Sequence, residues 1–386
     1  MRFRHPDGSV IHLSYCTNVH AAEDLDGVLS QLSRYAEPVR ERLGTDRLGL
    51  GLWLARPVAT RLLADRSALR TLRRELGLRG LEVVSLNAFP YAGFHAPSVK
   101  KEVYRPDWTT PERLSYTLDC ARVLAALLPD DARRGSVSTL PMAWREPASA
   151  QTPLIAGRHL TSLADGLGDL ARRTGRTIRV GLEPEPGCLI ESTAQAAELM
   201  AELDRERIGV CLDTCHLAVG FEQPAEALRR LSAAGLDVVK TQASCALEAA
   251  DPSDAAARAA LGRFAERRFL HQTRERAADG RLAAVDDLPQ ALAGDLPGRG
   301  PWRVHFHIPV HERPEPPLGT TRPVLLDSLR ALLGGPHAVT DHIEVETYTW
   351  SVLPGAREGD LGLVDGIAAE LDWSCRALTA LGLQPM

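Results

Sequence analysis

Short apolar segments alternate with amphipathic segments along almost the whole chain. Nine apolar segments have the length of a buried β-strand, and most are followed by a stretch with helical periodicity. The fifth and sixth of them begin thirty residues apart, the length of one strand, one helix and two loops. This repeat is typical of a (βα)8 TIM barrel, an α/β fold in which helices surround eight parallel strands. The predicted strands are 10–15, 48–54, 81–86, 136–140, 178–182, 208–212, 237–242, 304–308 and 342–347.

Nine predicted strands are one too many for the barrel, so one of them must lie outside it. We predict that 237–242 and 342–347 are the seventh and eighth strands. Residues 245–311 then form an insertion at the C-terminal rim, in which 303–308 folds towards the mouth of the barrel. The alternative is that 303–308 is a barrel strand and one of its neighbours is peripheral. Because the chain has no low-complexity segment or flexible linker, we expect a single domain over residues 1–386.

The segments between the strands predict the helices that would cover the barrel. Within the insertion, 269–273 and 282–285 are expected to pair as a hairpin across an Ala-Asp-Gly turn. Periodicity and end signals place helices at 23–43, 57–76, 109–128, 154–174, 192–206, 224–234, 253–268, 323–333 and 363–381.

Composition is that of an ordinary globular protein, with 44% hydrophobic and 25% charged residues. The formal net charge of −5 gives no electrostatic footprint for nucleic acid. No uninterrupted apolar segment approaches 18 residues, so we expect a protein that does not span a membrane. The seven cysteines are scattered without a Cys-x-x-Cys pair, which argues against a zinc finger or a thioredoxin-type site. We therefore expect a cytoplasmic protein whose partner is a small molecule.

Ionisable residues stand at the C-terminal ends of several predicted strands. Glu183 follows the fifth strand, Asp213 and His216 follow the sixth, and Glu346 lies near the end of the last. The C-terminal ends of parallel strands meet at the mouth of a barrel, so these groups can converge on one ion. Three carboxylates with one or two imidazoles suit Mn²⁺, Mg²⁺, Co²⁺ or Zn²⁺. We expect Glu185, by contrast, to turn outward along the rim.

Two polar residues, Lys240 and Gln242, share one face of the seventh predicted strand. An ammonium and an amide that face the barrel interior need polar partners, because unpaired burial is costly. Carboxylates at the mouth would supply them, which makes Lys240 a candidate catalytic group. Lys240 could equally be one member of a structural ion pair.

A pair of histidines, His305 and His307, shares one face of the segment 304–308. Imidazoles are common metal ligands. We predict that His307, nearer the end of its strand, approaches the carboxylates as a ligand or as an acid/base partner of the substrate. We expect His305 to contact the substrate. The alternative is that the pair packs the insertion against the barrel.

The long loop after the third predicted strand is rich in aromatic residues, including Tyr91 and Trp108. We expect these two side chains to line a substrate pocket. The alternative is an ordered surface loop that uses its aromatic side chains as a local core.

Several motifs resemble known families. Leu-Glu-Pro at 182–184, Leu-Asp-Thr-Cys-His at 212–216 and a Glu near the end of the last strand resemble the xylose-isomerase-like TIM barrels. That superfamily includes ketose epimerases, sugar isomerases and endonuclease-IV-type phosphodiesterases. Segments 103–108, 240–244, 304–307 and 344–350 more closely resemble EboE-type metabolite-traffic proteins of bacterial Ebo clusters.

The resemblance implies roles for individual residues. Glu183, Asp213 and Glu346 match the metal carboxylates of the superfamily, and His216 matches the histidine that touches the substrate. Gln242 stands where the superfamily usually has a histidine ligand, which departs from the pattern. The implied activity is a metal-dependent isomerase or epimerase, in which Glu183 and Glu346 exchange a proton on opposite faces of a small oxygenated metabolite.

A second function class is also compatible with the resemblance. A barrel of an Ebo-type cluster could bind and hand over a metabolite without turnover, in association with other proteins of its cluster. A phosphodiesterase acting on DNA is disfavoured, because the chain is acidic and lacks a basic stripe.

Overall fold

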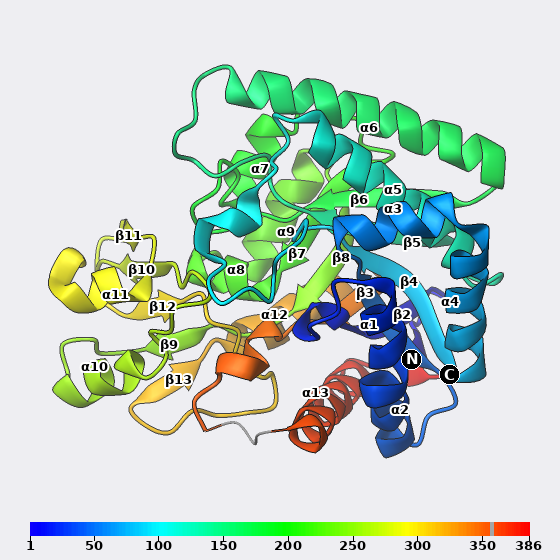
Figure 1. Ribbon diagram of the computed structural model, residues 1–386. Helices are drawn as coiled ribbons and strands as arrows, with labels where there is room; N and C mark the ends of the chain where they lie inside the picture. The colour runs from blue at the N-terminus through cyan, green and yellow to red at the C-terminus, as the bar shows by residue number, and fades with distance from the viewer. Residues whose placement is uncertain (356–358) are drawn as a thin grey trace.

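The computed structural model describes residues 1–355 and 359–386, and its main sheet closes into a barrel of eight parallel strands (Figure 1). The last barrel strand pairs with both the seventh and the first, which closes the barrel. Both strands that we assigned as seventh and eighth are therefore barrel strands. In order around the barrel the strands are β2 (Val10–Cys16), β3 (Leu48–Trp53), β4 (Leu81–Asn87), β5 (Arg134–Thr139), β6 (Thr177–Leu182), β7 (Ile208–Asp213), β8 (Val238–Ala243) and β14 (His342–Val345).

Burial on both faces explains why these strands are short apolar runs rather than alternating ones. Every residue of β3 and of β8 is buried, because one face packs inside the barrel and the other lies under the helices. The helices outside the barrel or at its rim are α1 (Leu25–Gln31), α2 (Glu37–Leu43), α3 (Arg56–Ala64), α4 (Arg66–Leu78), α5 (Pro111–Leu127), α6 (Thr152–Thr174), α7 (Thr193–Leu199), α8 (Thr214–Val219), α9 (Pro224–Ala233), α12 (Arg322–Leu333) and α13 (Asp360–Ala380). Within the described ranges, no helix is both long and apolar enough to cross a membrane.

Several helices differ from the prediction for local reasons. The single helix expected at 57–76 is two helices, because Asp65 has an extended backbone and its side chain caps α4 by accepting from the backbone N–H of Ser67. The helix expected at 192–206 ends at Leu199, although its capping box of Ser192 and Gln195 starts it as predicted. The helix expected at 23–43 is interrupted by a π-helical turn (η2, Leu32–Ala36).

The insertion between β8 and β14 forms an antiparallel sheet beside the barrel mouth, at the left of Figure 1. Its last strand extends the insertion to residue 320, so the predicted end at residue 311 was too early. Trp302, Phe306 and Leu318 belong to a separate apolar cluster inside it. The sheet order is β11 (Leu282–Val285), β10 (Thr273–Arg276), β12 (Trp302–Val304), β9 (Leu247–Ala249) and β13 (Leu318–Thr320), with α10 (Ala255–Gly262) and α11 (Leu288–Gln290) beside it.

The ninth predicted strand is only partly extended. Its first residues form β12, but the chain turns sharply where the N–H of Phe306 bonds to the carbonyl of Val304. The N–H of Ile308 then bonds to the carbonyl of Cys245, next to the end of β8. The alternative in which 303–308 is a barrel strand is therefore wrong, and this segment instead crosses to the barrel mouth. The predicted hairpin is present, but its first strand begins at Thr273 and the preceding helix ends at Gly262.

Inside the barrel, the backbone of Gly51 lies close to the carboxylate of Glu344. A Cβ added at Gly51 of β3 would lie 1.6 Å from the Oε2 atom of Glu344, so glycine leaves the space that this carboxylate occupies. We expect Gly51→Ala to lower the free energy of unfolding by about 1–3 kcal/mol through overpacking. Urea denaturation followed by circular dichroism would measure it.

A matched glycine provides the control for this measurement. Gly77 lies on the exposed side of α4, and a Cβ there would meet nothing within 4 Å. Gly77→Ala should leave stability unchanged or raise it by up to about 1 kcal/mol, because alanine is the better helix former. Equal effects of the two substitutions would contradict the steric explanation.

Candidate metal and substrate site

A cavity of about 520 Å³, its opening included, lies at the C-terminal ends of the barrel strands. Residues at or after the ends of β2, β4, β6, β7 and β14 supply polar groups to its lining, and the insertion supplies two histidines. The polar lining residues are Asn18, Asn87, Lys100, Glu183, Glu185, His216, His305, His307 and Glu346.

Aromatic side chains form the wall above this polar base. The expected wall residues Tyr91 and Trp108 lie outside the lining: Trp108 is fully buried and donates to the carbonyl of Leu140, while Tyr91 packs edge-on against Tyr116. For these two residues, the local-core alternative was the correct one. The loop after β4 contributes other aromatics instead, and the wall consists of Phe89, Phe94, Tyr104, Phe269 and Tyr348.

The loop after β4 and the insertion join each other over the cavity. The backbone N–H of Val99 donates to the carbonyl of Arg268 at 2.7 Å. The ammonium of Lys100 donates to the carbonyl of Phe269 at 2.7 Å and to the carboxylate of Asp287 at 2.6 Å. These contacts fix the two segments relative to each other, so the aromatic wall is held from both sides.

Three buried carboxylates meet at the C-terminal ends of the strands, and two of them, Glu183 and Glu346, line the cavity. Glu183 follows β6, Asp213 ends β7 and Glu346 follows β14. Each offers one oxygen within 4.8 Å of the oxygens of the other two, and all three side chains are buried. The predicted convergence of strand ends therefore brings these three residues together.

Hydrogen bonds satisfy only part of this cluster. The Oδ1 atom of Asp213 caps α8 by accepting from the N–H groups of Cys215 and His216 at 2.7 and 3.0 Å, and it also accepts from the Ser244 hydroxyl at 2.7 Å. Among the described residues, neither Oδ2 of Asp213 nor Oε2 of Glu183 has a hydrogen-bond partner.

The third carboxylate is held by two amides. Oε1 of Glu346 accepts from the side-chain amides of Asn18 at 2.8 Å and Asn87 at 3.0 Å. These asparagines were not predicted from the sequence. Both stand at or after strand ends, so the rule that found the carboxylates would have found them too.

The three carboxyl groups differ in their affinity for protons. Burial, together with the charges of Glu346 and Asp213, raises the pKa of Glu183 well above its usual value. Burial, then the charges of Asp213 and Glu344, raises the pKa of Glu346 in the same way. Burial opposes ionisation of Asp213 too, but the nearby imidazoles and hydrogen bonds lower its pKa. One carboxylate is therefore ionised while its two neighbours favour protons, unless a cation replaces those protons.

His307 faces this cluster from the insertion. Its Nδ1 donates to the backbone carbonyl of Glu346 at 2.7 Å, which leaves a lone pair on Nε2. Within residues 1–355 and 359–386, Nε2 has no hydrogen-bond partner, and it lies 3.9 Å from Oδ2 of Asp213. Burial lowers the pKa of His307 to about 4, so the ring is neutral at neutral pH. The atoms Glu183 Oε2, Asp213 Oδ2 and His307 Nε2 are called the open ligand atoms below.

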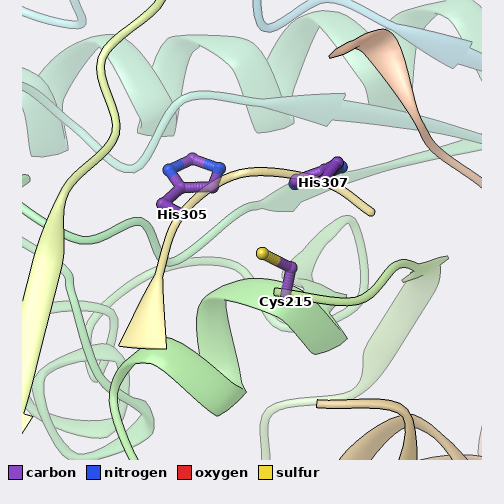
Figure 2. A group of neighbouring side chains, drawn as sticks. All are labelled: Cys215, His305 and His307. Atoms are coloured by element: carbon purple, nitrogen blue, oxygen red, sulfur yellow. The ribbon is translucent and has the colours of Figure 1, made fainter. Parts of the chain in front are cut away.

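Cys215 lies beside the two insertion histidines. Figure 2 shows His305 and His307 on the irregular segment after β12, with Cys215 on α8 below them. Its sulfur lies within 4.8 Å of a ring nitrogen of each. Burial and then the charge of Asp213 raise the pKa of the thiol well above its usual value. Cys215 therefore resists ionisation unless a cation takes the place of its proton.

Lys240 lies outside the cavity lining. Its ammonium is completely buried and donates to Oε1 of Glu344 at 2.8 Å and to the hydroxyl of Ser138 at 3.3 Å. Burial works against the charge, but Glu344 and other neighbours raise the pKa of Lys240 above its usual value. This geometry corresponds to the ion-pair alternative, not to a catalytic group that touches a substrate.

Gln242 lies on β8, between β7 and β14. Gln242 pairs in register with Asp213 on β7 and Glu344 on β14, and neither of its amide atoms has a hydrogen-bond partner in the described part of the chain.

Glu185 was expected to turn outward, but it is buried in the cavity lining. Its Oε1 accepts from the hydroxyl of Tyr104 at 2.6 Å, because the loop after β4 covers it.

Comparisons with known proteins agree with this architecture. Residues 42–267 match the family described as xylose isomerase-like TIM barrel. No curated protein matches the sequence significantly. A solved xylose isomerase-like TIM barrel protein from Mycobacterium smegmatis, in complex with magnesium, is 14% identical over 96% of this chain and 97% of that one, with a TM-score of 0.53. D-psicose 3-epimerase from Clostridium cellulolyticum H10, solved with D-tagatose, is 14% identical over 95% and 99% of the two chains, with a TM-score of 0.50.

The Lys240–Glu344 pair gives a testable distinction between a structural and a catalytic lysine. Lys240→Met would leave the carboxylate of Glu344 buried without its cation, so we expect a loss of about 3–5 kcal/mol in unfolding free energy. The double variant Lys240→Met/Glu344→Gln should lose less. Arg172→Met, which breaks an exposed pair with Asp169, should change stability by less than about 1 kcal/mol. A Lys240→Met protein as stable as the wild type in urea denaturation would contradict a structural ion pair.

Proposed function

The chain belongs to the xylose isomerase-like TIM-barrel family, and on this basis we propose that it is a metal-dependent isomerase or epimerase of a small oxygenated metabolite. The open ligand atoms carry the proposal. Two carboxylate oxygens and one neutral imidazole nitrogen are buried around Asp213, which groups with Glu183 and Glu346 on one side and with His216 and His307 on the other. Each of the three atoms lacks a hydrogen-bond partner within the described residues. Buried polar atoms without partners are rare, and a cation that they coordinate is one physical explanation.

Glu183, Asp213, Glu346 and His307 would hold this ion, with Gln242 as a further neutral oxygen ligand. Mn²⁺, Mg²⁺, Co²⁺ and Zn²⁺ all suit three carboxylates and one imidazole. The magnesium of the Mycobacterium smegmatis protein supports a divalent ion at such a barrel. When bound, the ion would polarise an oxygen of the substrate and so acidify the neighbouring C–H group.

Glu183 and Glu346 are the proposed acid/base pair. Burial, together with the charges of nearby carboxylates, raises the pKa of both above the usual value, which suits groups that exchange protons near neutral pH. One carboxylate would take a proton from the carbon next to the substrate carbonyl, and the other carboxyl group would return a proton to the opposite face. The amides of Asn18 and Asn87 fix the orientation of Glu346.

The cavity lining supports the proposed substrate class. Its base presents acceptors and donors suited to hydroxyl groups, and its wall presents aromatic rings. The D-tagatose bound to the epimerase from Clostridium cellulolyticum supports a small polyhydroxylated ligand. The likeness of segments 103–108 and 304–307 to EboE-type proteins supports a role in a bacterial metabolite-traffic pathway, with other proteins of that cluster as partners.

Proton exchange with solvent would test the proposed activity. The Mn²⁺-loaded protein should incorporate deuterium from D₂O into one of a panel of ketoses and sugar phosphates, detected by NMR. Glu183→Gln and Glu346→Gln should each slow this exchange by about 100-fold or more. Glu198→Gln, an exposed change on α7, should have no effect.

Two outcomes of this screen would contradict the proposed catalytic function. A compound that raises the melting temperature of the protein without exchanging deuterium would favour the binding and carrier function instead. A panel that neither binds nor exchanges would contradict both functions for these substrate classes.

The role of His307 can be measured through metal affinity alone. We expect His307→Ala to weaken Mn²⁺ or Co²⁺ binding about 10-fold or more in isothermal titration calorimetry, because the site loses its nitrogen donor. His337→Ala is the control, since the His337 side chain is 85% exposed. Unchanged affinity in the His307 variant would mean that this histidine only packs the insertion against the barrel.

A further inference from the structure

The cavity has a lining of two chemical kinds. Nine of its eighteen lining residues are polar, and the other nine are aromatic or aliphatic. Three of the aromatic rings pack against one another, because the ring centroids of Phe94, Phe269 and Tyr348 lie 4.9–5.4 Å apart. They come from the loop after β4, from the insertion and from the 3-10 helix after β14 (η5, Tyr348–Val352). This part of the wall is therefore supplied by segments outside the barrel strands.

The wall offers little hydrogen bonding to a ligand. The hydroxyl of Tyr104 donates to Oε1 of Glu185 at 2.6 Å and accepts from the side-chain amide of Gln272 at 2.8 Å, so it already has partners in both roles. A substrate hydroxyl placed against this wall would lose its hydration without a replacement, which is costly. An apolar group in the same place would instead gain free energy by leaving water.

The charges of the lining do not suit an anionic substrate. Among the described residues that line the cavity, Lys100 is the only lysine or arginine. Its ammonium donates to the carbonyls of Glu266 and Phe269, at 3.4 and 2.7 Å, and to the carboxylate of Asp287 at 2.6 Å. An ammonium has three N–H bonds, so all of them are used. Because three glutamates line the same cavity, a phosphate or carboxylate on the substrate would meet charges of its own sign.

We propose that the substrate is an uncharged hydroxy ketone that carries an aromatic ring beside its oxygenated end. The inference rests on the proposed isomerase or epimerase function and adds the class of compound on which it acts. The oxygenated end would face the carboxylates, and the ring would pack against Phe94, Phe269 and Tyr348. Aromatic rings prefer offset or edge-on contacts of the kind that these three side chains already make with one another. A sugar phosphate suits neither the wall nor the charge of this cavity.

Three compounds that share a hydroxymethyl ketone test the substrate class. Beside that group, hydroxyacetone has a methyl group, 2-hydroxyacetophenone a phenyl ring and dihydroxyacetone phosphate a phosphate ester. We expect the Mn²⁺-loaded, full-length protein to bind 2-hydroxyacetophenone about 10-fold or more tightly than hydroxyacetone, because the phenyl ring leaves water. Dihydroxyacetone phosphate should bind no more tightly than hydroxyacetone. Titration calorimetry would measure each Kd, and titrations of the metal-free protein would separate contacts with the chain from coordination of phosphate to Mn²⁺.

Variants of Phe269 test whether the wall makes this distinction. Phe269→Ala should abolish the preference for the phenyl ring and leave the affinity for hydroxyacetone within about twofold of the wild type, since only the ring contact is lost. Phe269→Leu keeps most of the apolar volume and should lose only part of the preference. Phe3→Ala is the control, because Phe3 is equally buried but lies on β1 (Arg2–Arg4), which pairs with the start of β2 at the opposite end of the barrel. Circular dichroism and the melting temperature would show whether each variant is folded.

Exchange of deuterium into the hydroxymethyl carbon separates this inference from the proposed function. Exchange without a preference for the phenyl ring would overturn the substrate class and leave the isomerase function intact. A phenyl preference that Phe269→Ala abolishes, without exchange in any compound, would support the ring site and overturn the isomerase function. Dihydroxyacetone phosphate that binds the metal-free protein more tightly than hydroxyacetone would overturn the exclusion of anions. A phenyl preference that persists in folded Phe269→Ala, or no binding of any of the three compounds, would overturn the inference.

Discussion

The burial of three carboxylates at one point is the constraint on which the rest of the site depends. Glu183, Asp213 and Glu346 approach within 4.8 Å where solvent cannot screen them, so their mutual repulsion must be offset. Backbone N–H groups satisfy one oxygen of Asp213, and two asparagines satisfy one oxygen of Glu346. The other oxygen of Asp213 lies 3.9 Å from Nε2 of His307, a neutral imidazole on the inserted segment. The insertion thus places an imidazole nitrogen beside Asp213, whereas its barrel neighbour Gln242 offers an amide.

The barrel could be predicted from sequence because burial on both faces makes each strand a distinct apolar run. The limits of the insertion could not be predicted from the sequence. Strand β13 contains only Leu318–Thr320, with a glycine in the middle, and such a short segment carries no periodicity. The end of β12 was not predictable either, because a turn at Phe306 interrupts an apolar run that continues in the sequence to Ile308. That turn depends on contacts with Cys245 and Gln272, far away along the chain.

The candidate site was predictable to the extent that topology determines it. Glu183, Asp213 and Glu346 had to meet because they end parallel strands of one barrel. Side chains on loops follow no such rule. The loop after β4 lies over the cavity, as its aromatic content suggested. Only tertiary packing, however, decides that Phe94 lines the cavity while Trp108 turns into the core. The burial of Glu185 is likewise set by a loop that is remote in sequence.

The separate apolar core of the insertion has an evolutionary consequence. Its sheet packs around Trp302 and Phe306, apart from the core of the barrel, so the two parts can accumulate substitutions independently. The carboxylates belong to the barrel, whereas His305 and His307 lie together on one inserted segment. A lineage could therefore gain or lose both imidazoles in one step, by a change in the length of that segment, without altering any barrel strand. The selectivity of such a barrel among metal ions can diverge while its scaffold is inherited unchanged.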